Sequence, residues 1–138
     1  MDPKPQTSRS AVCDHEGDHA VHIIELNPRK LLFLCDFLSV PGLRVTGSSD
    51  PERGLDYIAR AQPDVVICDL ALPQMEGEEL LDRIRKVSPR TRVILTSGRS
   101  SLPIVEHMRA GGGIDLLLGP LSAPGLLNAV QRMLPKAG

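Results

Sequence analysis

The sequence predicts an α/β fold in which a doubly wound parallel sheet carries helices on both faces. From about Ala20 onward, short apolar runs alternate with amphipathic stretches, and this alternation is typical of βα units. Residues 65–68 and 93–95 are apolar without interruption, as expected for strands that are buried on both faces of a sheet. The length of 138 residues allows one compact domain.

Five strands and five helices follow from these patterns. Residues 1–19 are polar and show neither helical nor strand periodicity, so we expect a mobile N-terminal extension followed by a domain over residues 20–138. The predicted strands are residues 21–26, 43–46, 64–68, 92–96 and 114–118. The predicted helices are about residues 28–38, 51–61, 76–86, 101–111 and 122–134.

Local signals place the ends of these helices. Asn27 and Asp50 each precede a proline, and a capping side chain followed by proline at the first helical position marks a helix start. The third helix opens with glutamates and closes with arginines and a lysine, which suits the helix dipole. Glycines at 111–113 end the fourth helix, and Pro135 ends the fifth.

Charge and composition argue against several classes of function. The 16 basic and 17 acidic residues give a net charge of -1, so no basic excess is available to neutralise a nucleic-acid backbone. Aromatic residues make up 2% of the chain, too few for surfaces that stack on bases or sugars. The 3 cysteines are far apart, which fits a reducing compartment, and no apolar run resembles a signal peptide or a membrane span. We therefore expect a cytoplasmic protein without nucleic-acid or membrane partners.

Candidate functional residues gather where the predicted strands end. Doubly wound sheets bind ligands outside the carboxyl ends of their strands. Glu25 lies at the end of the first predicted strand, Asp69 directly after the third and Ser97 directly after the fourth. Two carboxylates that converge at such an edge either share a cation or shift each other's pKa.

The segment around Asp69 carries a resemblance to a known family. Residues 63–77, PDVVICDLALPQMEG, resemble the phosphoacceptor strand and the following loop of response regulator receiver domains of two-component signalling, and the likeness extends over about residues 20–134. The resemblance implies a flavodoxin-like (βα)5 fold with a five-stranded parallel sheet of order 2-1-3-4-5. It also implies that Asp69 is the phosphoacceptor and that the backbone carbonyl of Ala71 is a metal ligand.

Two further segments match the same family. Ile24-Glu25-Leu26-Asn27-Pro28 resembles the family's acidic pair followed by Asn-Pro, with Glu25 on the first acid and Leu26 on the second. The resemblance therefore implies Glu25, Asp69 and Ala71 as ligands of Mg²⁺, with binding weakened by Leu26. Ser97 falls on the position of the phosphoryl-contacting hydroxyl, and Thr96 is the alternative.

The fifth predicted strand departs most from the family pattern. Gly119 stands at the position of the family's lysine, and Leu116 stands at the position usually held by an aromatic switch residue. Losing one charge-stabilising group typically slows such a reaction by about 10²–10³-fold. Arg99, just beyond the fourth strand, and Arg29, in the first turn of the first helix, are candidate substitutes for the missing positive charge.

Three classes of function stay open. The first is an atypical single-domain receiver that accepts phosphate at Asp69 from a sensor histidine kinase or phosphotransfer protein and signals to a downstream protein by contact. The second is a pseudo-receiver, an interaction module that signals without phosphate. The third is an aspartate-nucleophile phosphatase, which needs an acid two residues after the nucleophile, where this chain has Ala71. We therefore do not expect an enzyme.

The expected partner surface combines the fourth helix, the fifth strand and the fifth helix. In the family this face carries the signal and often a homodimer interface, and here it is rich in apolar residues. These are Leu102, Ile104, Val105, Met108, Leu116, Leu121, Leu126 and Leu127. A separate group, Cys13, His15, His19 and His22, has a spacing faintly like that of a zinc site, but the first three lie in the N-terminal extension and His22 lies inside the first predicted strand.

Overall fold

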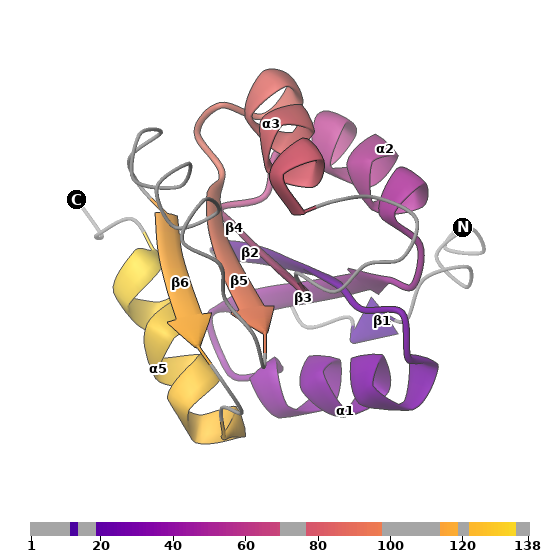
Figure 1. Cartoon of the computed structure of the whole chain (residues 1–138). Helices are drawn as coiled ribbons and strands as arrows, with labels where there is room; N and C mark the ends of the chain where they lie inside the picture. Colours follow the sequence, from indigo (N-terminus) through magenta and orange to yellow (C-terminus); the bar gives the residue numbers. More distant parts are fainter. Residues whose placement is uncertain (1–11, 14–18, 70–76, 98–113, 119–121, 135–138) are drawn as a thin grey trace, which may run out of the picture.

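The computed structural model describes residues 12–13, 19–69, 77–97, 114–118 and 122–134 of the chain. Its elements, in chain order, are β1 (Val12–Cys13), β2 (His19–Ile24), α1 (Pro28–Leu38), β3 (Leu43–Ser48), α2 (Pro51–Ala61), β4 (Val65–Asp69), α3 (Gly77–Val87), β5 (Arg92–Ser97), β6 (Ile114–Leu118) and α5 (Ala123–Met133). The described strands form one sheet of order β1-β3-β2-β4-β5-β6 (Figure 1). Neighbours from β3 to β6 are parallel.

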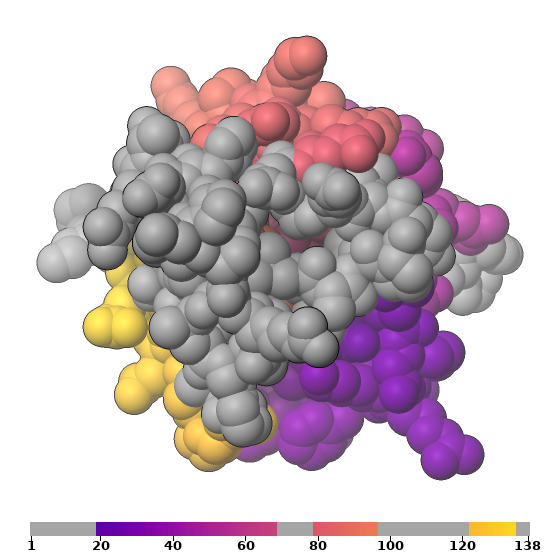
Figure 2. Space-filling view, viewed as in Figure 1, coloured from indigo at the N-terminus to yellow at the C-terminus, as the bar shows by residue number. Residues whose placement is uncertain are grey.

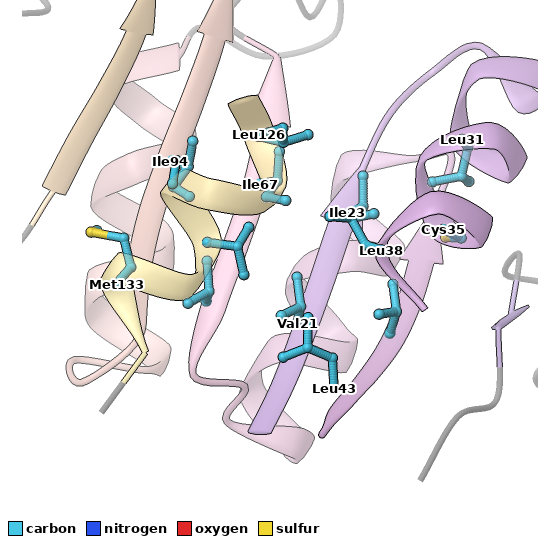
Figure 3. Packing of buried hydrophobic residues seen from close by; sticks show 14 residues of the cluster. Val21, Ile23, Leu31, Cys35, Leu38, Leu43, Ile67, Ile94, Leu126 and Met133 are labelled. Carbon is cyan, nitrogen blue, oxygen red and sulfur yellow. The ribbon is translucent and has the colours of Figure 1, made fainter. Parts of the chain in front are cut away.

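The described helices cover both faces of the sheet. On one face, Leu31 of α1 and Leu126 of α5 pack with Ile23 of β2 in one buried cluster (Figure 3). On the other face, Ile58 of α2 packs with Ile24 of β2 and with residues of α3 in a second cluster. Successive residues of β2 thus serve opposite cores, as the two-residue period of a strand requires. The space-filling view shows α3 on the opposite side of the molecule from α1 and α5 (Figure 2). The predicted parallel α/β architecture is confirmed.

Side-chain caps fix the starts of the first two helices. Asn27 Oδ1 accepts hydrogen bonds from the backbone N–H groups of Arg29 at 3.0 Å and Lys30 at 3.3 Å. Asp50 Oδ2 accepts one from the backbone N–H of Arg53 at 2.9 Å. These bonds satisfy donors that have no partner inside the helix. The predicted bounds of α1 and α2 are confirmed.

The N-terminal segment contains a strand that sequence analysis did not predict. Val12 and Cys13 form β1, whose register partners in β3 are Thr46 and Val45, and the pairing is antiparallel. The prediction of a purely parallel five-stranded sheet is therefore wrong at this edge. A strand of 2 residues is too short to show a periodic pattern, and it forms because β3 offers a row of backbone partners.

Some predicted boundaries shift, and some predictions lie outside the described residues. Strand β2 begins at His19, two residues earlier than predicted, because its backbone N–H donates to Gly42 O at 3.1 Å at the start of the pairing with β3. It also ends earlier, at Ile24, so that Glu25 follows the strand. Ser122 is the cap of α5, its Oγ accepting a hydrogen bond from Gly125 N at 3.2 Å. The predicted helix at 101–111 lies outside the described residues, as does the rest of the N-terminal extension.

Candidate functional site

The carboxyl ends of three neighbouring strands bring the predicted site residues to one edge of the sheet. Ile24 of β2 is the register partner of Cys68 of β4, so Glu25 leaves β2 beside the point where Asp69 ends β4. Strand β4 in turn pairs with β5, which ends at Ser97. Adjacent strands lie only about 4.8 Å apart. The backbone positions of Glu25, Asp69 and Ser97 therefore converge at this edge.

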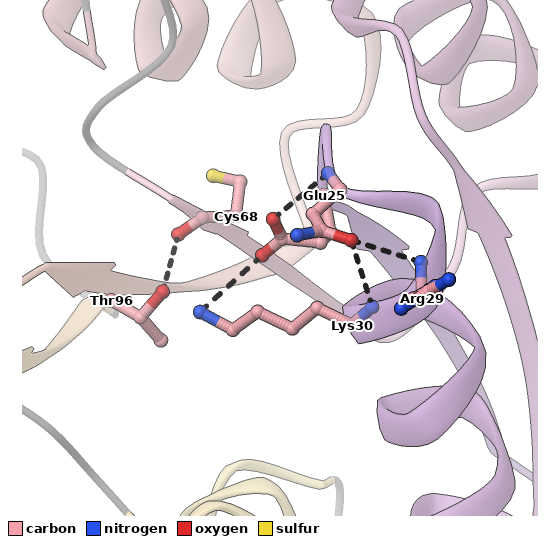
Figure 4. Close-up of polar contacts among 6 residues, drawn as sticks. Glu25, Arg29, Lys30, Cys68 and Thr96 are labelled. Atoms are coloured by element: carbon pink, nitrogen blue, oxygen red, sulfur yellow. Dashed lines mark hydrogen bonds and ion pairs between the residues drawn. The ribbon is translucent and has the colours of Figure 1, made fainter.

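Glu25 is a buried carboxylate with a partner for each oxygen. The residue is 7% exposed. Its Oε2 accepts a hydrogen bond from the backbone N–H of Asn27 at 3.2 Å, and its Oε1 lies 3.8 Å from Lys30 Nζ (Figure 4). A buried charge is costly unless it is paired and hydrogen-bonded. These two contacts therefore offset the cost of keeping the carboxylate at this edge.

Leu26 stands where the resembled family carries its second acid. Its side chain is partly buried and packs against the buried cluster between the sheet and helices α2 and α3. An apolar side chain offers no oxygen to a hard cation. The position is thus occupied by a residue that extends the core and supplies no ligand.

The described residues supply one carboxylate, that of Glu25, to the Mg²⁺ site that the resembled family implies. Mg²⁺ requires near-octahedral coordination by oxygen atoms. Glu25 offers a single carboxylate whose oxygens already have partners. Within the described part of the chain, no group of three or more His, Cys, Asp or Glu residues is placed to hold a metal ion. The predicted ligands Asp69 and Ala71 stay predictions, because the side chain of Asp69 and the whole of Ala71 lie outside what the structure describes.

Two hydroxyl residues close β5, and one of them already has a partner. Thr96 Oγ1 donates to the backbone carbonyl of Cys68 at 3.5 Å, a long hydrogen bond between β5 and β4 (Figure 4). Ser97 is the last residue of β5, and its side chain lies outside the described residues. The Thr96 hydroxyl thus has a partner in β4, and the role of Ser97 stays a prediction. Cys68 is 1% exposed, as expected for the apolar run over residues 65–68.

Lys30 is a positive charge at this edge that sequence analysis did not single out. Of the two predicted substitutes, Arg99 lies outside the described residues, and the contact described for Arg29 at this edge is that of its backbone N–H with Asn27 Oδ1. Lys30 instead forms the ion pair with Glu25. A signal was present in the sequence, because a lysine in the first turn of a helix is disfavoured by the helix dipole. Such a residue invites a search for an acid just before the helix, and Glu25 is that acid.

His22 is a buried structural histidine. Its Nδ1 shares a hydrogen bond with Thr46 Oγ1 at 2.7 Å, and its Nε2 shares one with Ser48 Oγ at 2.9 Å. Its ring stacks on that of Tyr57, with centroids 4.5 Å apart. Burial lowers the pKa of His22 from 6.5 to about 3, so the ring is neutral near pH 7. Because both ring nitrogens of His22 have hydrogen-bond partners, His22 is not free to bind zinc.

The predicted partner face is described only in part. Leu126 is 4% exposed and belongs to the core, and Leu127 packs against the same cluster. The side chains of the other apolar residues predicted for this face lie outside the described residues. Within the parts of the chain that the structure describes, no helix combines the length and apolar character that a membrane crossing needs.

Comparison with known proteins assigns the family. Residues 21–131 match the response regulator receiver domain. The chain is 31% identical over 115 residues to the C4-dicarboxylate transport transcriptional regulatory protein DctD of Pseudomonas aeruginosa, a match that covers 83% of this chain and 25% of that protein. It is 23% identical over 104 residues to sporulation initiation phosphotransferase F of Bacillus subtilis, covering 75% of this chain and 84% of that one.

A solved structure shares the fold. The response regulator receiver domain protein (CheY-like) from Methanospirillum hungatei JF-1 superposes with a TM-score of 0.76 at 24% identity, covering 83% of this chain and 91% of that one. The chain belongs to the response regulator receiver domain family, which acts in two-component signalling. It spans a quarter of the length of DctD (25%) and most of the length of the phosphotransferase (84%).

Proposed function

We propose that this chain is an atypical receiver in a two-component phosphorelay, with Asp69 as the phosphoacceptor and the Ser97 hydroxyl as a contact for the phosphoryl oxygens. The donor is a sensor histidine kinase or a phosphotransfer protein, and the signal passes to a downstream protein by contact. The proposal is carried by one observation: Glu25, Asp69 and Ser97 follow or end three neighbouring parallel strands at the same edge of the sheet.

The proposed chemistry depends on charge at this edge. A carboxylate attacks a phosphoryl group only where the repulsion between the two anions is relieved. A hydroxyl donor such as Ser97 stabilises the oxygens that gain charge during the transfer. Glu25, a buried carboxylate held by Asn27 and Lys30, adds negative charge that a cation has to balance.

The proposal includes the flavodoxin-like strand order 2-1-3-4-5, counted from β2. It is supported by the register between β5 and β6, which runs from Val93 with Ile114 to Ser97 with Leu118. This register places the end of β6, at Leu118, beside the end of β5. Leu26, Gly119 and Leu116 are the three departures that make the proposed receiver atypical.

A pseudo-receiver is the second candidate, and the local structure at Glu25 and Leu26 favours it. Leu26 is integrated into the core, and the Glu25 oxygens are already engaged. A domain that signals without phosphate needs neither residue to hold a metal. For either candidate we propose that partners, including a second copy of this chain, bind the surface of residues 101–111, β6 and α5, without the core residue Leu126 and the partly buried Leu127. Met108→Glu on that surface then weakens partner binding or self-association in sedimentation experiments.

Phosphorylation in vitro separates the two candidates. The protein is incubated with acetyl phosphate or with phosphorylated histidine kinases, and its intact mass is compared with that of Asp69→Ala. A receiver gains the mass of one phosphoryl group that alkali or hydroxylamine removes, and Asp69→Ala gains none. A folded wild-type protein that gains no phosphoryl group from any donor contradicts the phosphoacceptor role and favours the pseudo-receiver.

A further inference from the structure

One cation from α1 lies at the acidic edge of the sheet. Lys30 Nζ is 3.8 Å from Glu25 Oε1, and the two side chains are 55% and 10% exposed respectively. Figure 4 shows the Lys30 side chain running across the carboxyl ends of the strands, with Nζ toward the side where Thr96 lies. Within the described residues, Glu25 forms its ion pair with Lys30. Glu25 follows β2, and the neighbouring strand β4 ends at Asp69.

The charge balance at this edge demands such a cation. A phosphoryl group on Asp69 adds nearly two negative charges beside the buried Glu25 carboxylate. Like charges in a poorly solvated site repel strongly unless a positive charge stands between them. Leu26 stands at the position of the family's second acid, and Gly119 stands at the position of the family's strand-end lysine.

We propose that the Lys30 ammonium is the resident cation of this edge of the sheet, standing in for both the divalent metal and the missing lysine. The inference rests on the proposed function, because it assigns Lys30 to the same phosphoryl site. In the resting protein Lys30 pairs with Glu25. When Asp69 carries phosphate, the ammonium turns to the phosphoryl oxygens and neutralises part of their charge.

The geometry of Lys30 suits a change of partner. The ion pair is long, at 3.8 Å, and its lysine is half-exposed, so Lys30 can leave Glu25 while the backbone N–H of Asn27 still donates to Glu25 Oε2. The four-carbon stem is flexible and carries three donors that rotate freely. The transfer itself is balanced: an Asp69 carboxylate oxygen bonds to the phosphorus of acetyl phosphate, the bond from phosphorus to the acetyl oxygen breaks, and acetate leaves with that electron pair. No proton moves, and no metal is required.

Metal dependence of phosphorylation is the first test. The wild type is predicted to be phosphorylated by acetyl phosphate at rates within about twofold in Mg²⁺ and in EDTA. Lys30→Gln should slow the reaction about 10²-fold, as expected for the loss of one charge-stabilising group, and Lys30→Arg should restore most of it. The matched control is Arg29→Gln, which removes the same charge one residue earlier and should stay within about twofold of the wild type. Phosphorylation that requires Mg²⁺ in the wild type, or that is unaffected by Lys30→Gln, overturns the inference.

A second measurement keeps the inference separate from the proposed function. Mn²⁺ binding is followed by electron paramagnetic resonance on the unphosphorylated wild type, Lys30→Gln and Arg29→Gln. Removing a positive charge beside Glu25 should tighten Mn²⁺ binding by about tenfold in Lys30→Gln and hardly at all in Arg29→Gln. If no variant is ever phosphorylated but Lys30→Gln binds Mn²⁺ more tightly, the phosphoacceptor role fails while Lys30 is still supported as the resident cation of this edge. Equal Mn²⁺ binding by the wild type and Lys30→Gln overturns the assignment of Lys30, whatever happens at Asp69.

Discussion

The backbone N–H of Asn27 donates to Glu25 Oε2 at 3.2 Å, while the Asn27 side chain accepts the backbone N–H of Lys30 at 3.3 Å. One residue therefore joins the buried carboxylate to the first turn of α1. The same turn carries the ammonium that pairs with Glu25. The cap, the carboxylate and the cation form one local unit, so changes to the cap are felt both in stability and at the site.

Removing the Asn27 cap should destabilise the domain. Asn27→Ala leaves the N–H groups of Arg29 and Lys30 without a protein acceptor, which typically lowers the free energy of unfolding by about 1 kcal/mol. Urea unfolding followed by circular dichroism measures the change. Asn27→Ser retains a capping oxygen and should recover most of the loss. An unchanged urea midpoint for Asn27→Ala would show that the cap contributes nothing.

His22 should make the domain less stable in acid. Its pKa is about 3 in the folded protein and about 6.5 in the unfolded chain, so only the unfolded chain takes up this proton between those values. The contribution of His22 is complete above pH 6.5 and is lost as the pH falls toward 3, with a slope of up to about 1.4 kcal/mol per pH unit. The measurement is the free energy of unfolding as a function of pH.

The control for this prediction is His22→Gln, which keeps polar atoms in the cluster with Thr46 and Ser48 but does not titrate. Its unfolding free energy should be lower overall and should fall less steeply over the same pH range. Parallel pH profiles for the wild type and His22→Gln would mean that His22 already takes up its proton in the folded state.

Gly47 in β3 should not tolerate a side chain. A Cβ at this position would lie 2.7 Å from Leu31 Cδ1 and 3.1 Å from Cys35 Sγ, both on buried residues of α1. Gly47→Ala is therefore expected to lower the free energy of unfolding by about 1–3 kcal/mol through overpacking. In a Leu31→Ala background the added methyl group has room, so the same substitution should cost less. Equal costs in the two backgrounds would contradict the close packing of α1 on β3.

The two hydroxyls at the end of β5 should differ in their effect on phosphorylation. Ser97→Ala is expected to slow phosphorylation by acetyl phosphate about 10²-fold, because it removes a donor to the phosphoryl oxygens. Thr96→Val removes only the long hydrogen bond to Cys68 O and should change the rate less than about threefold. Initial rates of mass gain decide between them. The reverse order would move the phosphoryl contact to Thr96.

Local signals predicted the parts of the fold that short-range chemistry determines. The Asn27-Pro28 and Asp50-Pro51 pairs gave the bounds of α1 and α2, because a cap and a proline act within one turn. The apolar run before Asp69 gave β4, because a central parallel strand is buried on both faces. Strand β1 was missed because its strand partner lies about thirty residues further along the chain.

The site was predictable in its backbone frame and less so in its charges. The rule that ligands bind at strand ends placed Glu25, Asp69 and Ser97 at one edge. The pairing of Lys30 with Glu25 depends on the direction of a long side chain, which sequence spacing does not give. The two oxygens of Glu25 also have different partners. The sequence does not show that the backbone N–H of Asn27 donates to one of them.

The position of the phosphoryl group tests the central claim most directly. After incubation with a phosphodonor, borohydride reduces an aspartyl phosphate to homoserine, and tandem mass spectrometry of the peptides locates the changed residue. We predict homoserine at position 69 in the wild type, none in Asp69→Ala, and reduced yield in Ser97→Ala. Homoserine at another aspartate, or at none while the protein is folded and the donor is active, contradicts the assignment of Asp69 as the phosphoacceptor.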